Sequence, residues 1–96
     1  MNTEIKAVHF SLRDETREYL EKKIERIPNA ENMIVDLLFT LTKGKNFSVE
    51  VTVNFRWGVA IHLKETDFDL NPAIDKLMDK LDAKIAKEKD KVKEKR

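Results

Sequence analysis

The sequence predicts an α+β fold of two layers, in which two helices pack on one face of a four-stranded sheet in the order β-α-β-β-β-α. The strongest observation is the segment 47–55, where apolar and polar residues alternate strictly, as in a strand buried on one face. Shorter alternating segments flank it, and segments with helical spacing of apolar residues precede and follow this meander. A chain of 96 residues is long enough for one such core, so we expect a single domain over 1–96.

A strand followed by a helix is expected at the N-terminus. The strand is predicted over Thr3–Phe10. Ser11 is expected to cap the helix, with Asp14 three residues later in the first turn. Pro28 and Asn29 are expected to end it. The predicted buried side of this helix is Leu12, Tyr19, Leu20, Ile24 and Ile27.

Three alternating strands form the predicted meander, joined by turns at Gly44 and Gly58. Trp57, in the second turn, is interpreted either as an exposed contact or as a hydrophobic plug at the end of the sheet, and the role of Arg56 beside it stays open. The predicted buried faces are Val35, Leu37, Phe39 and Leu41 in the first strand, Phe47, Val49, Val51, Val53 and Phe55 in the second, and Val59, Ile61 and Leu63 in the third.

The last helix carries its charges in separate sectors. Asp69 or Asn71 is expected to cap it, with Pro72 in the first turn, where a missing amide donor costs little. At about 100° per residue, the apolar arc expected to pack on the sheet is Ile74, Leu77, Met78, Leu81, Ile85 and Val92. The lysine arc beside it is Lys76, Lys80, Lys84, Lys87, Lys91 and Lys95, and the acidic arc is Asp75, Asp79, Asp82 and Asp90. From about Glu88 onward we expect the helix to project beyond the core.

The small formal charge of +1 conceals an asymmetry along the chain. Residues 76–96 contain nine basic and five acidic side chains, a net +4, whereas the rest contains ten basic and thirteen acidic side chains, a net −3. One interpretation is a solvated helix whose lysines lie near the negative end of its dipole. The other is a polyanion-binding surface, on which lysines along one side of a helix neutralise successive phosphates.

The composition argues against several classes of function. Without cysteine there are no disulfides or thiolate nucleophiles, which suits a reducing compartment, and we expect a cytoplasmic protein. No segment approaches the ~20 apolar residues that span a bilayer, so no membrane partner is expected. His9 and His62 lack metal-ligand spacing and are interpreted as ordinary strand residues, so no metal or cofactor is expected. Ser11 and Ser48 have structural explanations, and there is no Gly-rich phosphate loop, so neither an enzyme nor a small-molecule substrate is expected.

The order of elements and two motifs resemble a known family, over essentially the whole chain. The last helix contains Asp69-Leu70-Asn71-Pro72-Ala73-Ile74-Asp75, then Asp79-Lys80-Leu81, then the row Lys87, Lys89, Lys91 and Lys93. This is similar to a run of Asp-Met-Tyr-Ala-Ala-Ile-Asp, then Asp-Lys-Leu and a basic row. The first helix contains Arg17-Glu18-Tyr19 before the basic residues Lys23 and Arg26. The chain thus resembles the ribosome hibernation family: the hibernation-promoting factors and ribosome-associated inhibitor proteins, also labelled sigma-factor modulation proteins.

The sequence departs from the family pattern at two sites. Asn71 and Pro72 replace the usual Tyr-Ala, and Ala83 stands where an Arg is common, with Lys84 as its candidate replacement. The chain ends at Arg96 without the long C-terminal dimerisation domain of the long members, so the resemblance is to a short form.

The resemblance implies a factor that binds the small ribosomal subunit in the mRNA and tRNA channel and inhibits translation by occlusion, preserving inactive ribosomes. Two alternatives stay open: a protein-interaction or regulatory module that uses the charged helix, and a generic duplex-RNA-binding domain. Off the ribosome we expect a monomer, because no exposed apolar seam demands an oligomer. The expected rRNA-binding residues are Lys23, Arg26, Lys80, Lys84, Lys87, Lys89 and Lys91.

Overall fold

The computed structural model describes the backbone of residues 1–94 and the side chains of residues 1–91. It confirms the predicted α+β class and adds one short helix. The elements are β1 (Asn2–Val8), α1 (Asp14–Glu25), α2 (Ala30–Met33), β2 (Ile34–Lys43), β3 (Phe47–Phe55), β4 (Ala60–Asp67) and α3 (Leu70–Glu94).

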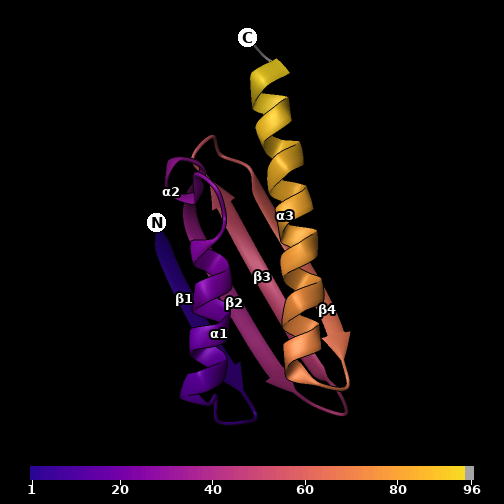
Figure 1. The fold of residues 1–96 in the computed structure, drawn as a ribbon. Helices are drawn as coiled ribbons and strands as arrows, with labels where there is room; N and C mark the ends of the chain where they lie inside the picture. The colour runs from indigo at the N-terminus through magenta and orange to yellow at the C-terminus, as the bar shows by residue number, and fades with distance from the viewer. Residues whose placement is uncertain (95–96) are drawn as a thin grey trace.

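The four strands form one mixed sheet in the order β1-β2-β3-β4. β1 is parallel to β2, while β2, β3 and β4 form the antiparallel meander. A parallel pair needs a crossover connection, and α1 supplies it. Figure 1 shows α1 and α3 side by side on one face of the sheet, with the other face left open.

The core lies between the sheet and the two long helices. Alternation in β3 buries Val49, Val51, Val53 and Phe55 completely or nearly so. The apolar arc of α3 packs onto this face as predicted, and its buried members are Ile74, Leu77, Met78, Leu81 and Ile85. The side chain of Val92, the last predicted member, lies outside the described residues.

The start of β2 differs from the prediction. Val35 is 41% exposed, whereas Ile34 is fully buried. The register explains the difference, because Ile34 pairs with Phe55 and Asp36 with Asn54, which leaves Val35 as the extra residue of a β-bulge. The bulge shifts the alternation by one residue, so Ile34 takes the core position that the sequence pattern assigned to Val35.

The connection from β1 to α1 also differs from the prediction. The strand ends at Val8, and His9 has a left-handed backbone with φ 67°, so the interpretation of His9 as a strand residue is wrong. The ring of Phe10 packs edge-on against Phe47, with centroids 5.6 Å apart, which holds the chain in this early turn. Ser11 is therefore too far from the helix to cap it: α1 begins after Arg13, whose side chain makes no cap hydrogen bond.

The opposite end of the sheet is closed by the turn after β3. Trp57 stacks on Phe55 with ring centroids 4.9 Å apart and packs against the core, which confirms the interpretation as a hydrophobic plug. Arg56 donates through Nε and Nη2 to the carbonyl oxygen of Glu31 at 3.1 and 2.9 Å, and so fixes α2 to this turn. Gly58 completes the turn with φ 85°, a conformation that costs other residues roughly 1–2 kcal/mol.

α3 is the longest element and runs past the end of the sheet, as Figure 1 shows. It begins at Leu70, so Asp69 and not Asn71 precedes the first turn, and Pro72 occupies a position whose amide needs no helical partner. Ile85 and Glu88 are still buried, and the residues after Glu88 whose side chains are described are exposed. The predicted projection of the helix beyond the core is confirmed. No described helix has the length and apolarity that crossing a membrane requires.

Candidate nucleic-acid interface

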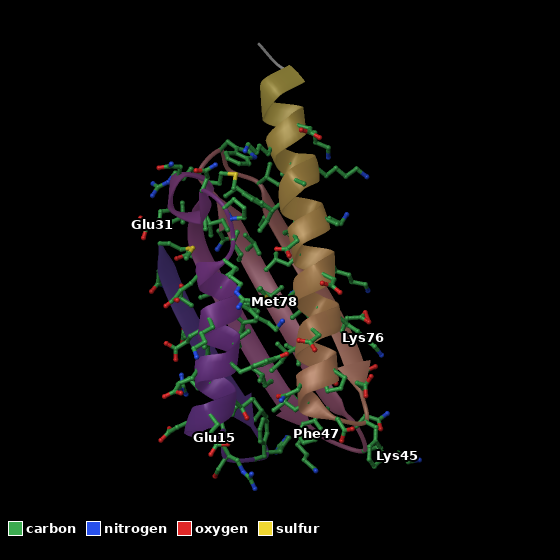
Figure 2. All side chains as sticks on the ribbon, viewed as in Figure 1. Glu15, Glu31, Lys45, Phe47, Lys76 and Met78 are labelled. Atoms are coloured by element: carbon green, nitrogen blue, oxygen red, sulfur yellow. The ribbon has the colours of Figure 1, made fainter. Side chains whose placement is uncertain are left out.

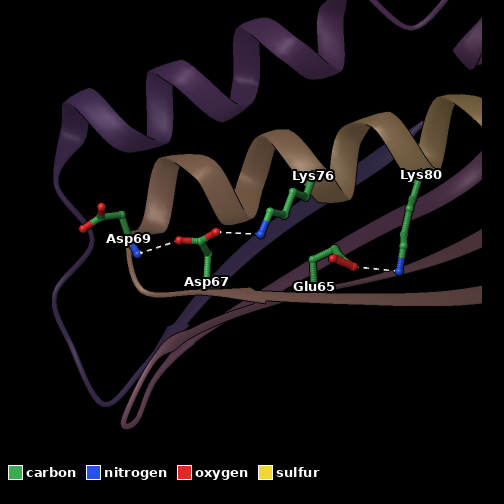
Figure 3. A network of polar contacts seen from close by, with 5 residues as sticks. All are labelled: Glu65, Asp67, Asp69, Lys76 and Lys80. Carbon is green, nitrogen blue, oxygen red and sulfur yellow. Dashed lines mark hydrogen bonds and ion pairs between the residues drawn. The ribbon is translucent and has the colours of Figure 1, made fainter.

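The lysine arc of α3 faces the edge strand β4. Lys76 Nζ lies 2.7 Å from Asp67 Oδ2, and Lys80 Nζ lies 2.6 Å from Glu65 Oε2, as Figure 3 shows. The hydrogen bond from Lys76 holds the pKa of Asp67 below its ordinary value, and the same bond raises the pKa of Lys76. Both lysines are about half exposed, so water screens each pair and its contribution to stability is small. The first two turns of the arc are thus neutralised by the body of the protein.

The next turns of the arc border a groove of about 360 Å³ between α3 and β4, which we call the lysine groove. Lys84 and Lys87 are exposed there, and the part of the chain that the structure describes places no carboxylate within ion-pair distance of either ammonium. Cations beside a shallow apolar surface can approach phosphate oxygens without first breaking an internal ion pair. The residues that line the groove are Leu63, Lys80, Ala83, Lys84 and Lys87.

The acidic arc of α3 faces α1 instead. The Tyr19 hydroxyl donates to Asp75 Oδ1 at 2.5 Å, and Lys23 Nζ lies 3.0 Å from the same oxygen. Lys23 also lies 5.0 Å from the centroid of the Tyr19 ring. The hydrogen bond from Tyr19, followed by that from Lys23, holds the pKa of Asp75 below its ordinary value, and the Asp75 carboxylate raises the pKa values of both Tyr19 and Lys23. These three side chains therefore clasp the two long helices together.

The same side of α3 carries Asp82 and Lys89. Burial raises the pKa of Asp82, Asp79 raises it further, and the nearby Lys23 opposes the shift. Lys89 follows Asp82 by seven residues, which is within roughly 20° of two full helical turns, so it points in nearly the same direction. Lys23 and Lys89 therefore lie on the α1 side of α3, away from the lysine groove.

Replacing Asp75 by asparagine tests the helix clasp. We expect a loss of about 1 kcal/mol or less in the free energy of unfolding, because the carboxylate is half exposed. The pKa of Asp75 is lower in the folded state than in the unfolded state. The stabilisation by its carboxylate is therefore fully present at pH values above the unfolded-state pKa of about 4, and it disappears as the pH falls through the folded-state pKa. Urea unfolding at several pH values should show wild type and Asp75→Asn converging below about pH 4. A constant difference at all pH values would contradict this assignment.

The structure divides the seven predicted rRNA-binding residues. Lys80, Lys84 and Lys87 come together at the lysine groove, with Lys80 paired to Glu65. Lys91 belongs to the same arc and lies 3.4 Å from Glu88. The other predicted residues lie on the α1 side: Lys23 half-buried in the clasp, Arg26 exposed just after α1, and Lys89 exposed on α3.

The contribution of β4 to this surface was not predicted from the sequence. Glu65 and Asp67 continue the alternation of Ile61 and Leu63 and therefore face the helix layer. Acidic residues at inward positions of an edge strand need cationic partners. That pattern could have predicted that Lys76 and Lys80 form internal ion pairs. Ala83, a site where the sequence departs from the family pattern, lines the groove with its small side chain.

Comparisons with known proteins agree with this architecture. The structure is similar to a ribosomal subunit interface protein from Coxiella burnetii, with a TM-score of 0.85 and 24% identity, covering 93% of this chain and 98% of that one. It is also similar to the N-terminal domain of Protein Y from Thermus thermophilus, with a TM-score of 0.75 and 28% identity, covering 88% of this chain and 96% of that one. The profile of the family described as sigma 54 modulation protein / S30EA ribosomal protein matches residues 3–93. The chain therefore belongs to the sigma 54 modulation protein / S30EA ribosomal protein family.

Proposed function

We propose that this protein is a ribosome hibernation factor, which binds the small ribosomal subunit in the channel used by mRNA and tRNA. The family and the fold are those of ribosome-associated proteins, and one of the similar structures is described as a ribosomal subunit interface protein. Bound in that channel, the domain inhibits translation by occlusion in the cytoplasm and catalyses no reaction.

The lysine groove is the observation that carries this proposal. An elongated domain of 45 × 20 × 19 Å presents the ammonium groups of Lys84 and Lys87 on one side of a helix that extends past the sheet, and no carboxylate of the described residues pairs with either. These cations neutralise successive phosphates of the ribosomal RNA, while Arg26 and Lys89 are available for contacts on the α1 side. Glu65 and Asp67 of β4 are paired with Lys80 and Lys76, and Asp75 of α3 is paired with Lys23, which limits repulsion of the RNA by these three carboxylates.

Co-sedimentation with isolated small subunits and with empty whole ribosomes tests the proposal. We expect the protein to pellet with both, and we expect the logarithm of the association constant to fall by roughly 0.7–0.9 per phosphate contact for each tenfold rise in salt. Excess unrelated duplex RNA should not displace the protein from the ribosome, whereas it would displace a generic duplex-RNA-binding domain. Protein that stays in the supernatant at low salt would overturn the proposal and favour the interaction module.

A further inference from the structure

The end of the domain farthest from the C-terminal turns of α3 carries an exposed aromatic ring. Phe68, between β4 and α3, is 78% exposed, more than any other large apolar side chain among the described residues. Burial of such a side chain would be favourable, and the fold does not bury it here. A single exposed apolar residue is ordinary in itself, so the surroundings of Phe68 decide whether it marks a site.

The backbone around Phe68 is held at both sides. The Asp69 amide donates to Asp67 Oδ1 at 3.1 Å, and Asp67 Oδ2 accepts from Lys76 at 2.7 Å, as Figure 3 shows. Phe68 is the middle residue of this turn, so the hydrogen bonds that fix its neighbours direct its ring outward. The ring is thus presented on a rigid turn, and little conformational entropy is lost if it binds a partner.

A basic hairpin lies beside this turn. Asp67 pairs with Phe47 across β3 and β4, and Phe47 pairs with Lys43 across β2 and β3. Figure 2 shows Lys45 and Phe47 at this end of the molecule, near the start of α3. Lys43 Nζ lies 4.4 Å from the centroid of the Phe47 ring, and both Lys43 and Lys45 are exposed.

The local charge is positive where the ring is exposed. The hairpin segment 43–46 contains two lysines and no acidic residue. In the neighbouring turn the charge of Asp67 is compensated by Lys76, so Asp69 is the remaining carboxylate there. Aromatic rings interleaved with lysines are the combination that binds single-stranded nucleic acid, because bases stack on the ring and phosphates contact the ammonium groups. A purely apolar protein partner would gain nothing from the two lysines.

We propose that this end of the domain is a second RNA contact, in which Phe68 stacks on an unpaired base and Lys43 and Lys45 bind the flanking phosphates. The proposal rests on the proposed function, since the base belongs to the ribosomal RNA. Lys84 follows the start of α3 by 14 residues, about 21 Å along the helix, so the two contacts are separate. Two contacts at that spacing would fix the orientation of the long axis of the domain in the channel.

The test is binding of variants at Phe68 to isolated small subunits, measured by co-sedimentation and by chemical probing of unpaired bases. Loss of one stacked base by Phe68→Ala should weaken binding by about 5- to 150-fold and re-expose one base, while bases protected by the lysine groove stay protected. Phe68→Trp should retain binding, and Phe68→Leu should behave like Phe68→Ala. Val35→Ala, at another exposed apolar residue, is the matched control and should change nothing.

The role of the lysines is tested by the salt dependence of binding. Replacing both Lys43 and Lys45 by alanine should reduce the slope of log K against log salt by about 1.4, the value for two phosphate contacts to a single strand. An unchanged slope would overturn their assignment. Wild-type affinity of Phe68→Ala would overturn the stacking contact, and restoration by Phe68→Leu would replace it with an apolar contact to a ribosomal protein.

A titration with hexauridylate separates this inference from the proposed function. If wild type fails to pellet with small subunits, the proposed function fails. The assignment of the base to ribosomal RNA then fails as well, and the stacking contact with single-stranded RNA stands only if wild type binds the hexamer and Phe68→Ala binds it at least about 5-fold more weakly. If wild type pellets and Phe68→Ala pellets equally well with the same bases protected, the proposed function stands and this inference fails.

Discussion

Replacing Lys84 and Lys87 by glutamate is expected to lower the affinity for isolated small subunits by about 100-fold or more. A hydrogen bond to a charged group contributes roughly 1.5–3 kcal/mol, and the double variant removes two such contacts and adds repulsion of the phosphates. Both side chains are exposed, and neither is paired within the described residues, so the fold should not suffer. Sedimentation at low salt gives the dissociation constants, and thermal unfolding verifies that the variant is folded.

Lys22 and Lys64 provide the matched control for this charge reversal. Both are exposed, Lys22 on α1 and Lys64 on the open face of the sheet. Replacing these two lysines by glutamate changes the net charge by the same amount as replacing Lys84 and Lys87. We expect only the small loss that a general change in net charge causes. Equal losses in both double variants would show that binding depends on overall charge and not on the lysine groove. Lys80 should matter less for binding than Lys84 or Lys87, because Glu65 already pairs with it.

Truncating Leu81 is expected to have the largest effect on stability. Leu81 is fully buried where α3 packs on the sheet, and Leu81→Ala should lower the free energy of unfolding by about 2–5 kcal/mol. In a domain of this size that corresponds to a fall in melting temperature of roughly 8–40 °C. Thermal unfolding followed by circular dichroism measures the change. The lysine groove is built on this helix, so binding at 37 °C should weaken in proportion to the unfolded fraction.

The variant Leu81→Met, which conserves the side-chain volume, distinguishes the effect of a cavity from the effect of changing the residue type at this position. It should cost less than about 1.5 kcal/mol, because methionine can fill most of the space without leaving a cavity. Binding of Leu81→Ala should recover at low temperature, where more of the protein is folded. Weak binding by a fully folded variant would mean that Leu81 orients the lysines and does not merely anchor the helix.

The sequence predicted those parts of the fold that depend on local periodicity. The alternation in 47–55 and the helical spacing in 70–94 each define a single apolar face that has to be buried. The fold class, the two layers and the buried side of α3 therefore followed from the pattern. The exceptions are places where the backbone departs from regularity. The bulge at Val35 and the left-handed His9 depend on pairing with β3 and on packing of Phe10, which no local pattern contains.

The candidate site shows the same division. The sequence by itself determined that the lysines, the aspartates and the apolar residues of the last helix occupy three separate arcs, because helical geometry fixes the direction of each side chain. Only the tertiary structure decided which arc meets which neighbour. The aspartates face α1, where Asp75 holds Lys23 in the clasp, whereas β4 neutralises Lys76 and Lys80 and leaves Lys84 and Lys87 open. The physical reason is that pairing depends on residues distant in sequence, so whether a lysine is free to bind phosphate is set by the sheet edge beside it.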